Sequence, residues 1–271
     1  MVSCKDYVEM RKSQLKDEVS KFDKKPHLAV LQIGNNPASN TYIKNKKLAC
    51  EEVGIEFTHI NLPDTVHRSD VVNTLLMIAE VADGILLQLP IPDHLDVDDL
   101  LRFIPPSKDV DGFTRVSEFN PCTPKGIIDY LKYNNIKLRG KHVVILGRSK
   151  IVGLPLTNMM IHEGATVTCC NSKTKYLKRI TRQADIIVSA IGKPKHLTSK
   201  YFKDDQIVID VGINRDENGK LCGDVDYNEV MDTYAIHVTP VPGGVGKLTV
   251  CSLLENVVEA YKGKINGNDR D

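Results

Sequence analysis

The sequence has no tryptophan, few aromatic residues of any kind and almost no net charge. Aromatic residues make up 6% of its 271 residues, and 36 basic side chains against 35 acidic ones give a formal charge of +1. This balance gives no electrostatic basis for binding nucleic acid or an anionic membrane. The longest apolar runs, such as 84–87 and 207–212, have the length of β-strands and are too short for a signal peptide or a membrane span. We therefore expect a cytoplasmic protein with neither a nucleic-acid nor a membrane partner.

The sequence also lacks any close pairing of cysteines. Its seven cysteines are odd in number, and no two form a C-x-x-C pair: Cys4, Cys50, Cys122, Cys169, Cys170, Cys222 and Cys251. A zinc site or a disulfide framework needs tighter spacing, and the histidines are equally scattered. We expect free, mostly buried thiols in a reducing compartment, and no metal site.

The first part of the chain alternates between strand-like and helix-like patterns. A helix capped by Ser3 is expected before Pro26. Three strands (27–33, 56–61 and 84–89) and two helices (38–53 and 69–81) follow. This alternation predicts a parallel sheet covered by helices.

A second series of alternations begins after a proline-rich region at 104–124. Thr123 is expected to cap a helix with Pro124 at its first position. Strands are expected at 142–147, 166–170, 185–190, 206–211 and 234–238, and helices at 152–163, 174–181 and 248–261. The series predicts a doubly wound domain, so the chain as a whole is an α/β protein of two domains.

The segment 143–155 combines a buried strand, a glycine turn and the start of a helix. The first backbone N–H groups of such a helix have no partner within it, and its dipole is positive there, so a phosphate is a natural ligand. Gly147 and Gly153 are spaced G-x-x-x-x-x-G, which is not the G-x-G-x-x-G fingerprint of dinucleotide-binding proteins. A nucleotide site is therefore favoured here, with a purely structural turn as the alternative.

The strand after this turn bears on which nucleotide is bound. In the ordinary dinucleotide fold, an acidic residue at the end of that strand binds the ribose of NAD, whereas a basic site accepts the 2′-phosphate of NADP. Here the strand 166–170 ends in Asn171-Ser172-Lys173, without an acid, and Arg148 lies on the preceding turn. Arg, Ser and Lys suit a phosphate dianion, so NADP is favoured over NAD. The alternative is that Arg148 is a solvated surface charge.

Tyr42 and Lys46 form a second constellation, within the helix expected at 38–53. Their spacing of four places both side chains on one helical face, about 6 Å apart at Cβ. The same Tyr-x-x-x-Lys pair serves short-chain dehydrogenases, but there it follows the nucleotide turn, whereas here it precedes it by a whole domain. Crowding with Lys44 and Lys47, together with burial, would lower the pKa of Lys46 enough for it to act as a base. A solvated lysine-rich face is the alternative.

Two further stretches lie where ligands of parallel sheets bind. Gln88, in Gln88-Leu-Pro-Ile-Pro, follows a strand, and Asp109 and Asp111 lie in a loop between the domains. Either aspartate can bind a cationic or amidine-like edge, although an Asp-x-Asp is more often a turn. The glycine-rich segment 243–249 lacks the spacing of a phosphate loop, so we reject that function for it.

Taken together, eight motifs resemble the methylenetetrahydrofolate dehydrogenase/methenyltetrahydrofolate cyclohydrolase family. The resemblance runs through nearly the whole chain, in the order of the family. The motifs are Tyr42-x-x-x-Lys46, Gln88-Leu-Pro, Lys108-Asp-Val-Asp-Gly, Pro121-Cys-Thr-Pro-Lys-Gly, Gly147-Arg-Ser-x-Ile-Val-Gly-x-Pro, Val211-Gly-Ile-Asn, Gly223-Asp-Val and Thr239-Pro-Val-Pro-Gly-Gly-Val-Gly.

The resemblance implies a bifunctional enzyme of one-carbon folate metabolism. It would oxidise 5,10-methylenetetrahydrofolate with NADP and then hydrolyse the 5,10-methenyl product to 10-formyltetrahydrofolate. The catalytic residues implied are Lys46, Tyr42, Gln88 and Asp111, with Asp111 holding the pterin. The implied cofactor-binding residues are Gly147, Arg148, Ser149, Ile151, Val152, Ser172 and Ile213. The implied substrate-binding residues are Tyr42, Gln88, Leu89, Pro90, Asp111, Pro242, Gly243, Gly244 and Val245.

The resemblance also implies a domain arrangement. Residues 1–121 with about 246–271 would form the folate-binding catalytic domain, and 122–245 a Rossmann-type NADP domain, with the reaction in a cleft between them. The C-terminal helix would pack back on the first domain, and two NADP domains would pair into a homodimer. The alternatives are a dehydrogenase-only relative, against which the retained Lys46 argues, a different NADP oxidoreductase of the same plan, and a catalytically idle folate-binding protein.

Overall fold

A computed structural model describes residues 1–114 and 116–268 of the chain. The chain divides into two compact units, each made of segments distant in the sequence. We call Glu9–Cys122 with the residues from Val250 onward the three-strand unit. Met1–Val8 with Thr123–Thr249 form the five-strand unit. Within the described residues, no helix is long and apolar enough to cross a membrane.

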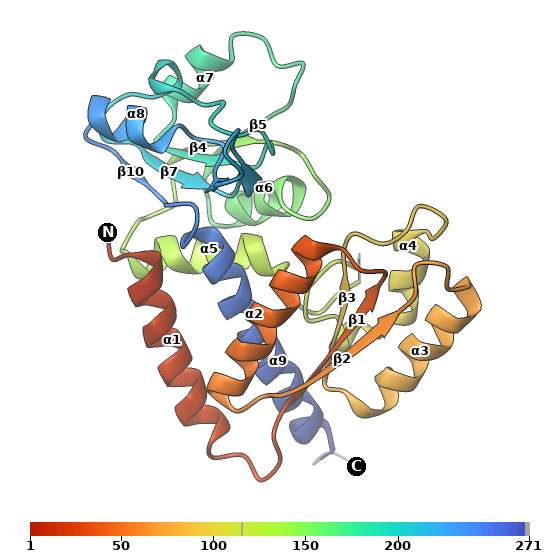
Figure 1. Cartoon of the computed structure of the whole chain (residues 1–271). Coiled ribbons are helices and arrows are strands. Elements are labelled where there is room, and N and C mark those ends of the chain that lie inside the picture. Colours follow the sequence, from red (N-terminus) through yellow and green to blue (C-terminus); the bar gives the residue numbers. More distant parts are fainter. Residues whose placement is uncertain (115, 269–271) are drawn as a thin grey trace. The chain divides into compact units, whose positions relative to one another are not determined.

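The three-strand unit is built on a parallel sheet with the strand order β2-β1-β3. The strands are β1 (His27–Ile33), β2 (Glu56–Leu62) and β3 (Gly84–Gln88). The helices are α2 (Pro37–Val53), α3 (Arg68–Val81), the short α4 (Val97–Leu100) and most of α1 (Cys4–Val19) (Figure 1). Strand β1 reads as a continuous apolar run because its two faces are covered by different helices.

Alternate residues of β1 enter two separate cores. Leu28 and Val30 pack in the cluster that includes α2 and the C-terminal helix α9 (Val245–Asn268). Ala29 and Leu31 pack in the cluster that includes α3. This is the period of two expected of a strand, with both faces buried.

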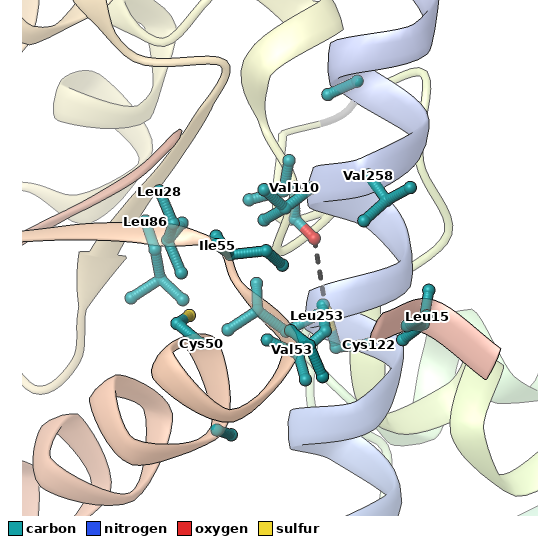
Figure 2. Packing of buried hydrophobic residues seen from close by; sticks show 14 of the residues in the cluster. Leu15, Leu28, Cys50, Val53, Ile55, Leu86, Val110, Cys122, Leu253 and Val258 are labelled. Atoms are coloured by element: carbon teal, nitrogen blue, oxygen red, sulfur yellow. Dashed lines mark hydrogen bonds between the residues drawn. The ribbon is translucent and has the colours of Figure 1, made fainter. Parts of the chain in front are cut away.

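The C-terminal helix completes the first of these cores, as Figure 2 shows. Leu253 and Val258 of α9 pack in one cluster with residues of α2 and of the sheet. Buried Asn256 donates its side-chain N–H groups to the carbonyl oxygens of Val110, at 2.9 Å, and Asn120, at 3.2 Å. The expectation that the C-terminal helix packs back on the first domain is confirmed.

The five-strand unit is built on a parallel sheet with the order β10-β7-β6-β4-β5. Its strands are β4 (His142–Leu146), β5 (Thr166–Cys170), β6 (Ile186–Ser189), β7 (Ile207–Asp210) and β10 (His237–Val238). Its helices are α5 (Cys122–Tyr133), α6 (Gly153–His162), α7 (Leu177–Gln183) and α8 (Tyr227–Thr233). The strand order reverses direction at β4, which is the arrangement of a doubly wound fold. The predicted fold class is confirmed.

Several elements differ from their predicted bounds or were missed. Helix α5 begins at Cys122, before Thr123, and the strand expected at 234–238 is confined to His237–Val238. Helices α4 and α8, and a hairpin of β8 (Asn214–Arg215) with β9 (Leu221–Cys222), were not predicted. These elements are two to seven residues long, which is too short for a hydrophobic period to be visible in the sequence.

The first eight residues belong to the five-strand unit, whereas the sequence analysis placed them in the first domain. The backbone N–H of Val2 donates to Asn134 Oδ1 at 2.6 Å, and the Tyr130 hydroxyl donates to the Val2 carbonyl at 2.8 Å. The Tyr7 ring lies 5.7 Å from that of Tyr130 and 5.0 Å from that of Tyr133, between centroids. Helix α1 therefore begins in one unit and continues into the other.

Candidate functional site

Lys46 is buried at the carboxyl-terminal edge of the sheet of the three-strand unit. It lies on α2, is only 8% exposed, and its Nζ donates to Gln88 Oε1 at 2.9 Å. Gln88, the last residue of β3, in turn donates its Nε2 to the Leu89 carbonyl at 2.8 Å. Ser39 Oγ donates to the same carbonyl at 3.2 Å. The lysine that the sequence singled out is thus buried, and its amine is hydrogen-bonded to a side-chain amide that is itself held in place.

Burial lowers the pKa of the Lys46 amine, because the charged form loses its hydration. The Asp111 carboxylate, when ionised, acts in the opposite direction and raises it. Crowding by Lys44 and Lys47, which the sequence suggested as a second cause, does not contribute, because both side chains are exposed. The predicted direction is therefore right, and burial is its cause.

Tyr42 and Asp111 have environments that favour their neutral forms. Tyr42 is half-buried, one turn before Lys46 on α2, and burial raises the pKa of its phenol. Burial also raises the pKa of the Asp111 carboxyl, and the positive charge of Lys46 opposes that rise. The neighbouring Asp109 is buried, and its carboxylate accepts the N–H of Thr114 at 2.8 Å. The Asp109 carboxylate therefore forms a hydrogen bond within its own loop. Of the two aspartates, Asp111 is the candidate for binding the substrate.

Leu89 and Pro90 line a hollow next to the Lys46–Gln88 pair. It has a volume of about 490 Å³ and is otherwise lined by Ile91, Pro92, Asp93, Leu95 and Val97. The peptide bond between Leu89 and Pro90 is cis. A mostly apolar wall that begins at the carbonyl held by Gln88 suits the flat, partly apolar body of an organic ligand.

In the five-strand unit, the strand β4 is followed by Gly147, whose φ of 111° is accessible essentially to glycine alone. A Cβ added at this residue would lie 2.3 Å from the Ala190 carbonyl oxygen, and one added at Gly153 would lie 2.1 Å from the Gly147 oxygen. Both glycines of the G-x-x-x-x-x-G spacing are therefore required by close backbone approaches. This is a physical reason for a motif that matched no standard fingerprint.

A backbone hydrogen bond brings the turn that carries Arg148 close to the residues that follow β5. The N–H of Gly147 donates to the carbonyl of Cys170, the last residue of β5, at 3.0 Å. The turn that carries Arg148 therefore lies beside the end of β5, after which Ser172 follows, and both side chains are exposed. Asn171 uses its side chain to accept the N–H of Lys173 at 2.8 Å.

The remaining residues predicted to bind the cofactor line the start of α6 and the loop after β7. Ser149 Oγ accepts the N–H groups of Val152 at 3.2 Å and Gly153 at 3.4 Å. Ile151 is 42% exposed and Ile213 is 49% exposed, although both are apolar. Apolar side chains left exposed beside a polar turn are consistent with a ligand contact.

The predicted substrate segment before α9 belongs to the five-strand unit. Pro242 is exposed and Gly243 half-buried, whereas Gly244 and Val245 are buried. Gly244 packs tightly, because an added Cβ would lie 2.4 Å from the Pro240 carbonyl oxygen. These residues are therefore in a different unit from Lys46, Gln88 and Asp111.

Sequence reasoning missed two buried carboxylates at the carboxyl ends of β6 and β7. Asp210 and Asp224 are 3% and 0% exposed. Burial raises the pKa of Asp210 to about 6. Asp224 appeared in the sequence only as part of the Gly223-Asp-Val motif, with no role assigned to it. In residues 1–114 and 116–268, no group of three or more His, Cys, Asp or Glu side chains is placed to hold a metal ion.

The fold and these two centres define a class of protein. It is a two-domain α/β protein in which one unit carries a buried lysine and the other, a doubly wound unit, carries a glycine turn of the dinucleotide-binding type. Residues 2–111 match the catalytic domain of the tetrahydrofolate dehydrogenase/cyclohydrolase family, and residues 121–265 match its NAD(P)-binding domain. The chain belongs to the tetrahydrofolate dehydrogenase/cyclohydrolase family.

Individual relatives agree with this assignment over nearly full length. The bifunctional protein FolD of Bacillus cytotoxicus is 45% identical over 276 residues, covering 97% of this chain and 96% of its own. The crystal structure of the bifunctional FolD dehydrogenase/cyclohydrolase of Campylobacter jejuni is 42% identical, covers 97% of this chain and 98% of its own, and has a TM-score of 0.92. The FolD structure of Trypanosoma brucei, complexed with NADP and an inhibitor, is 30% identical, covers 98% of each chain and has a TM-score of 0.92.

Proposed function

We propose that this chain catalyses two consecutive reactions of one-carbon folate metabolism. It oxidises 5,10-methylenetetrahydrofolate to 5,10-methenyltetrahydrofolate with NADP, and it hydrolyses that product to 10-formyltetrahydrofolate. The observation that carries the proposal is the buried Lys46 amine, hydrogen-bonded to Gln88 at 2.9 Å, in a chain that matches both domains of the family. The same observation disfavours a dehydrogenase-only protein and an idle folate-binding protein, because neither needs a buried amine.

Lys46 supplies the base for the hydrolytic step. Water adds to the electron-poor methenyl carbon and the amine of Lys46 accepts its proton, which gives a neutral hydroxyl adduct. The bond from that carbon to N5 then breaks: N5 leaves with the bonding electron pair and takes up a proton, while the hydroxyl gives up its proton and becomes the formyl carbonyl. A lowered pKa gives more of the neutral amine that this step requires. Gln88 holds the amine in place, and the largely neutral phenol of Tyr42 packs on the same helix face without adding a competing charge.

Other residues of the three-strand unit would hold the folate. We assign Asp111 to the pterin, because its side chain is partly accessible and its carboxyl interacts with the charge of Lys46, whereas the Asp109 carboxylate is buried and accepts the N–H of Thr114. Leu89 and Pro90 offer the apolar wall next to Gln88. Pro242, Gly243, Gly244 and Val245 are assigned to the folate as well, from the five-strand unit.

The residues of the five-strand unit fit NADP. The side chains of Arg148, Ser149 and Ser172 are exposed around the turn. The loop after β6 leaves open space at Gly192, where an added Cβ would meet nothing within 4 Å. Arg148 and Ser172 would bind the 2′-phosphate, while Gly147 and the start of α6, with Ile151 and Val152, would take the rest of the dinucleotide. When bound, NADP accepts the hydride. Ile213 would lie along the cofactor.

We further propose a cytoplasmic homodimer that pairs through the five-strand unit. The free thiols are those of a reducing compartment. Strand β5 ends the order of the sheet, and α6, which packs beside it, leaves Leu154 and Ile161 about half exposed. An open edge and an apolar helix face support pairing there. A monomeric mass in sedimentation equilibrium would contradict it.

The proposed function is tested by a Lys46→Gln substitution, with Lys47→Gln as its matched control. Lys47 lies on the same helix but is exposed. The formation of reduced cofactor from methylenetetrahydrofolate, with NADP and with NAD, measures the dehydrogenase, and the loss of methenyltetrahydrofolate measures the hydrolysis. We expect the Lys46 variant to lose hydrolysis by at least about 100-fold, while it still binds folate and NADP remains the preferred cofactor.

The Lys47 variant should resemble the wild type in both assays. An unaltered hydrolysis rate in the Lys46 variant would remove this lysine from the mechanism. A wild-type protein that shows neither activity, or that reduces NAD better than NADP, would overturn the proposed function itself.

A further inference from the structure

The two buried carboxylates of the five-strand unit, Asp210 and Asp224, connect its sheet to two loops through hydrogen bonds. Asp210 is the last residue of β7, and Asp224 lies before α8, in the turn after the hairpin. Neither carboxylate is used in the reactions described above. Their hydrogen bonds, however, reach the loops at the carboxyl ends of β6 and β7, which is where ligands of doubly wound sheets bind.

Asp224 accepts hydrogen bonds from four donors. Its Oδ2 accepts from Ser189 Oγ and from the backbone N–H of Ile191, both at 2.8 Å. Its Oδ1 accepts from the backbone N–H of Lys193 and from Asn214 Nδ2, both at 2.9 Å. One carboxylate thus fixes the end of β6, the loop that follows it and the residue next to Ile213.

Asp210 holds the segment that presents Asp224. Its carboxylate accepts the backbone N–H groups of Asp224 at 3.0 Å, Val225 at 2.9 Å and Gly212 at 2.9 Å. Two glycines allow these approaches. A Cβ added at Gly212 would lie 2.4 Å from the carboxyl carbon of Asp224, and one added at Gly223 would lie 1.9 Å from Asp210 Oδ2.

The loop held by Asp224 is in direct contact with the nucleotide turn. The N–H of Ala190 donates to the Leu146 carbonyl at 2.8 Å. The Ala190 carbonyl lies so close to Gly147 that no Cβ fits between them. A displacement of the loop 190–193 would therefore displace one wall of the turn.

We propose that Asp224 is a positioning residue for the dehydrogenase reaction, because it fixes the loops after β6 and β7 against the Gly147 turn. This inference rests on the proposed function of the five-strand unit. A carboxylate suits the task since it offers acceptors only, whereas an amide of the same shape would turn the hydrogens of its NH₂ group toward two of the four donors. A misplacement of about 1 Å in groups that orient reactants can reduce a rate about 100-fold.

An Asp224→Asn variant tests the inference, and the cyclohydrolase activity is an internal control. The hydrolytic lysine lies in the three-strand unit, whereas Asp224 lies in the five-strand unit. We expect the dehydrogenase kcat/KM for NADP to fall about 100-fold, with hydrolysis changed less than about 2-fold. The matched variant is Asp185→Asn, which also removes a carboxylate that accepts a backbone N–H, but at the other edge of the same sheet. It should leave both activities unchanged.

An Asn214→Ala variant decides the question if Asp224→Asn does not fold. It removes one donor and leaves the carboxylate with three partners. We expect it to lower the dehydrogenase kcat/KM by at least about 10-fold without affecting hydrolysis, in line with the loss of a single hydrogen bond to a charged group.

Equal losses of both activities, in whichever of these variants folds, would show a merely structural role and overturn the inference. So would an unchanged dehydrogenase. Both outcomes presuppose a wild type with both activities, so the failure of this inference is distinct from a failure of the proposed function.

Discussion

His27 in the three-strand unit and His142 in the five-strand unit occupy equivalent places. Each is the first residue of a central strand. The His27 backbone N–H donates to Asp83 Oδ2 at 2.9 Å, and the Asp83 N–H donates back to the His27 carbonyl at 2.9 Å. The His27 ring lies between two partners, with Nδ1 3.4 Å from the Val81 carbonyl and Nε2 2.8 Å from Thr58 Oγ1.

The second unit repeats this arrangement almost atom for atom. The His142 backbone N–H donates to Asp185 Oδ2 at 2.8 Å, and the Asp185 N–H donates back to the His142 carbonyl at 2.9 Å. The ring of His142 has Nδ1 3.3 Å from the Gln183 carbonyl and Nε2 3.0 Å from Thr168 Oγ1. Both aspartates precede the third strand, and both threonines are third in the second strand. The amino-terminal edges of the two sheets are therefore built alike.

The likeness continues to the glycine at the other end of each central strand. Gly34 and Gly147 both have positive φ, of 80° and 111°. Each donates its N–H to the last residue of the neighbouring strand, Leu62 at 2.8 Å and Cys170 at 3.0 Å. The difference begins only after these glycines.

In the three-strand unit, a protein side chain caps the helix after the glycine. Asn36 Oδ1 accepts the N–H groups of Ala38 at 2.9 Å and Ser39 at 3.1 Å. In the five-strand unit the corresponding hydrogen bonds, to Ser149 Oγ, are longer, and basic and polar side chains surround the turn. Two βαβ units of the same plan therefore differ only at one end. The amino-terminal edges are built alike, whereas the carboxyl-terminal edge carries either a buried amine or the glycine turn to which we assign NADP.

The largest difference between the two units is expected when a methyl group is added to each of these glycines. Gly147→Ala would place a Cβ 2.3 Å from the Ala190 oxygen, whereas Gly34→Ala would place one 3.4 Å from Asp64 Cβ. We expect the first to reduce the dehydrogenase kcat/KM for NADP by at least about 100-fold. The second should cost about 1–2 kcal/mol of stability from its left-handed φ and spare NADP binding. Titration with NADP and urea unfolding measure the two effects, and similar losses of NADP affinity would contradict the distinction.

The pH dependence of hydrolysis distinguishes the buried Lys46 amine from the exposed nucleotide turn. Because the folded pKa of Lys46 lies below the ordinary 10.5, the neutral amine increases as pH rises through that lowered value. The hydrolytic rate should therefore rise with pH, at most about tenfold per pH unit, and level off above the folded pKa, which lies below 10.5. The same lowered pKa affects stability. As pH falls from 10.5 to the folded pKa, Lys46 takes up a proton in the unfolded chain but not in the folded one, so the folded state loses stability over this range.

The measurement is a pH profile of kcat/KM for hydrolysis, corrected for the reaction without enzyme. The same rise in the Lys46→Gln variant would show that another group titrates. NADP binding at the turn should not follow this profile.

The smallest expected effect concerns the shared amino-terminal edges. Asp83→Asn removes a carboxylate that also pairs with Lys264 at 2.8 Å and is nearly inaccessible to solvent, so we expect a loss of about 1–3 kcal/mol. Asp185→Asn should cost less than about 1 kcal/mol, because Asp185 and its partner Lys141 are each 45% exposed. Urea unfolding measures both, and activities should be unchanged. A larger loss from Asp185→Asn would contradict the role given to burial.

Much of the fold was predictable from local patterns. The strand at 27–33 has the predicted bounds, because a buried parallel strand reads as an apolar run. The strand at 166–170, at the edge of its sheet, also has the predicted bounds. Helix α2 was predictable from its turn and its final Gly54. The short α8 was not, since its seven residues begin at a cap made by Asp226 and carry no visible period.

The sequence by itself determined the family, the alternation of strands and helices, and the residue types at both centres. Only the tertiary structure decided which of several lysines is buried, because burial depends on residues as distant in sequence as Gln88 and Asp111. It also brings together the four hydrogen-bond donors of Asp224, which come from two separate segments, 189–193 and Asn214. The likeness of the two amino-terminal edges was equally invisible, since His, Thr and Asp are far apart in sequence and meet only when parallel strands pair in register.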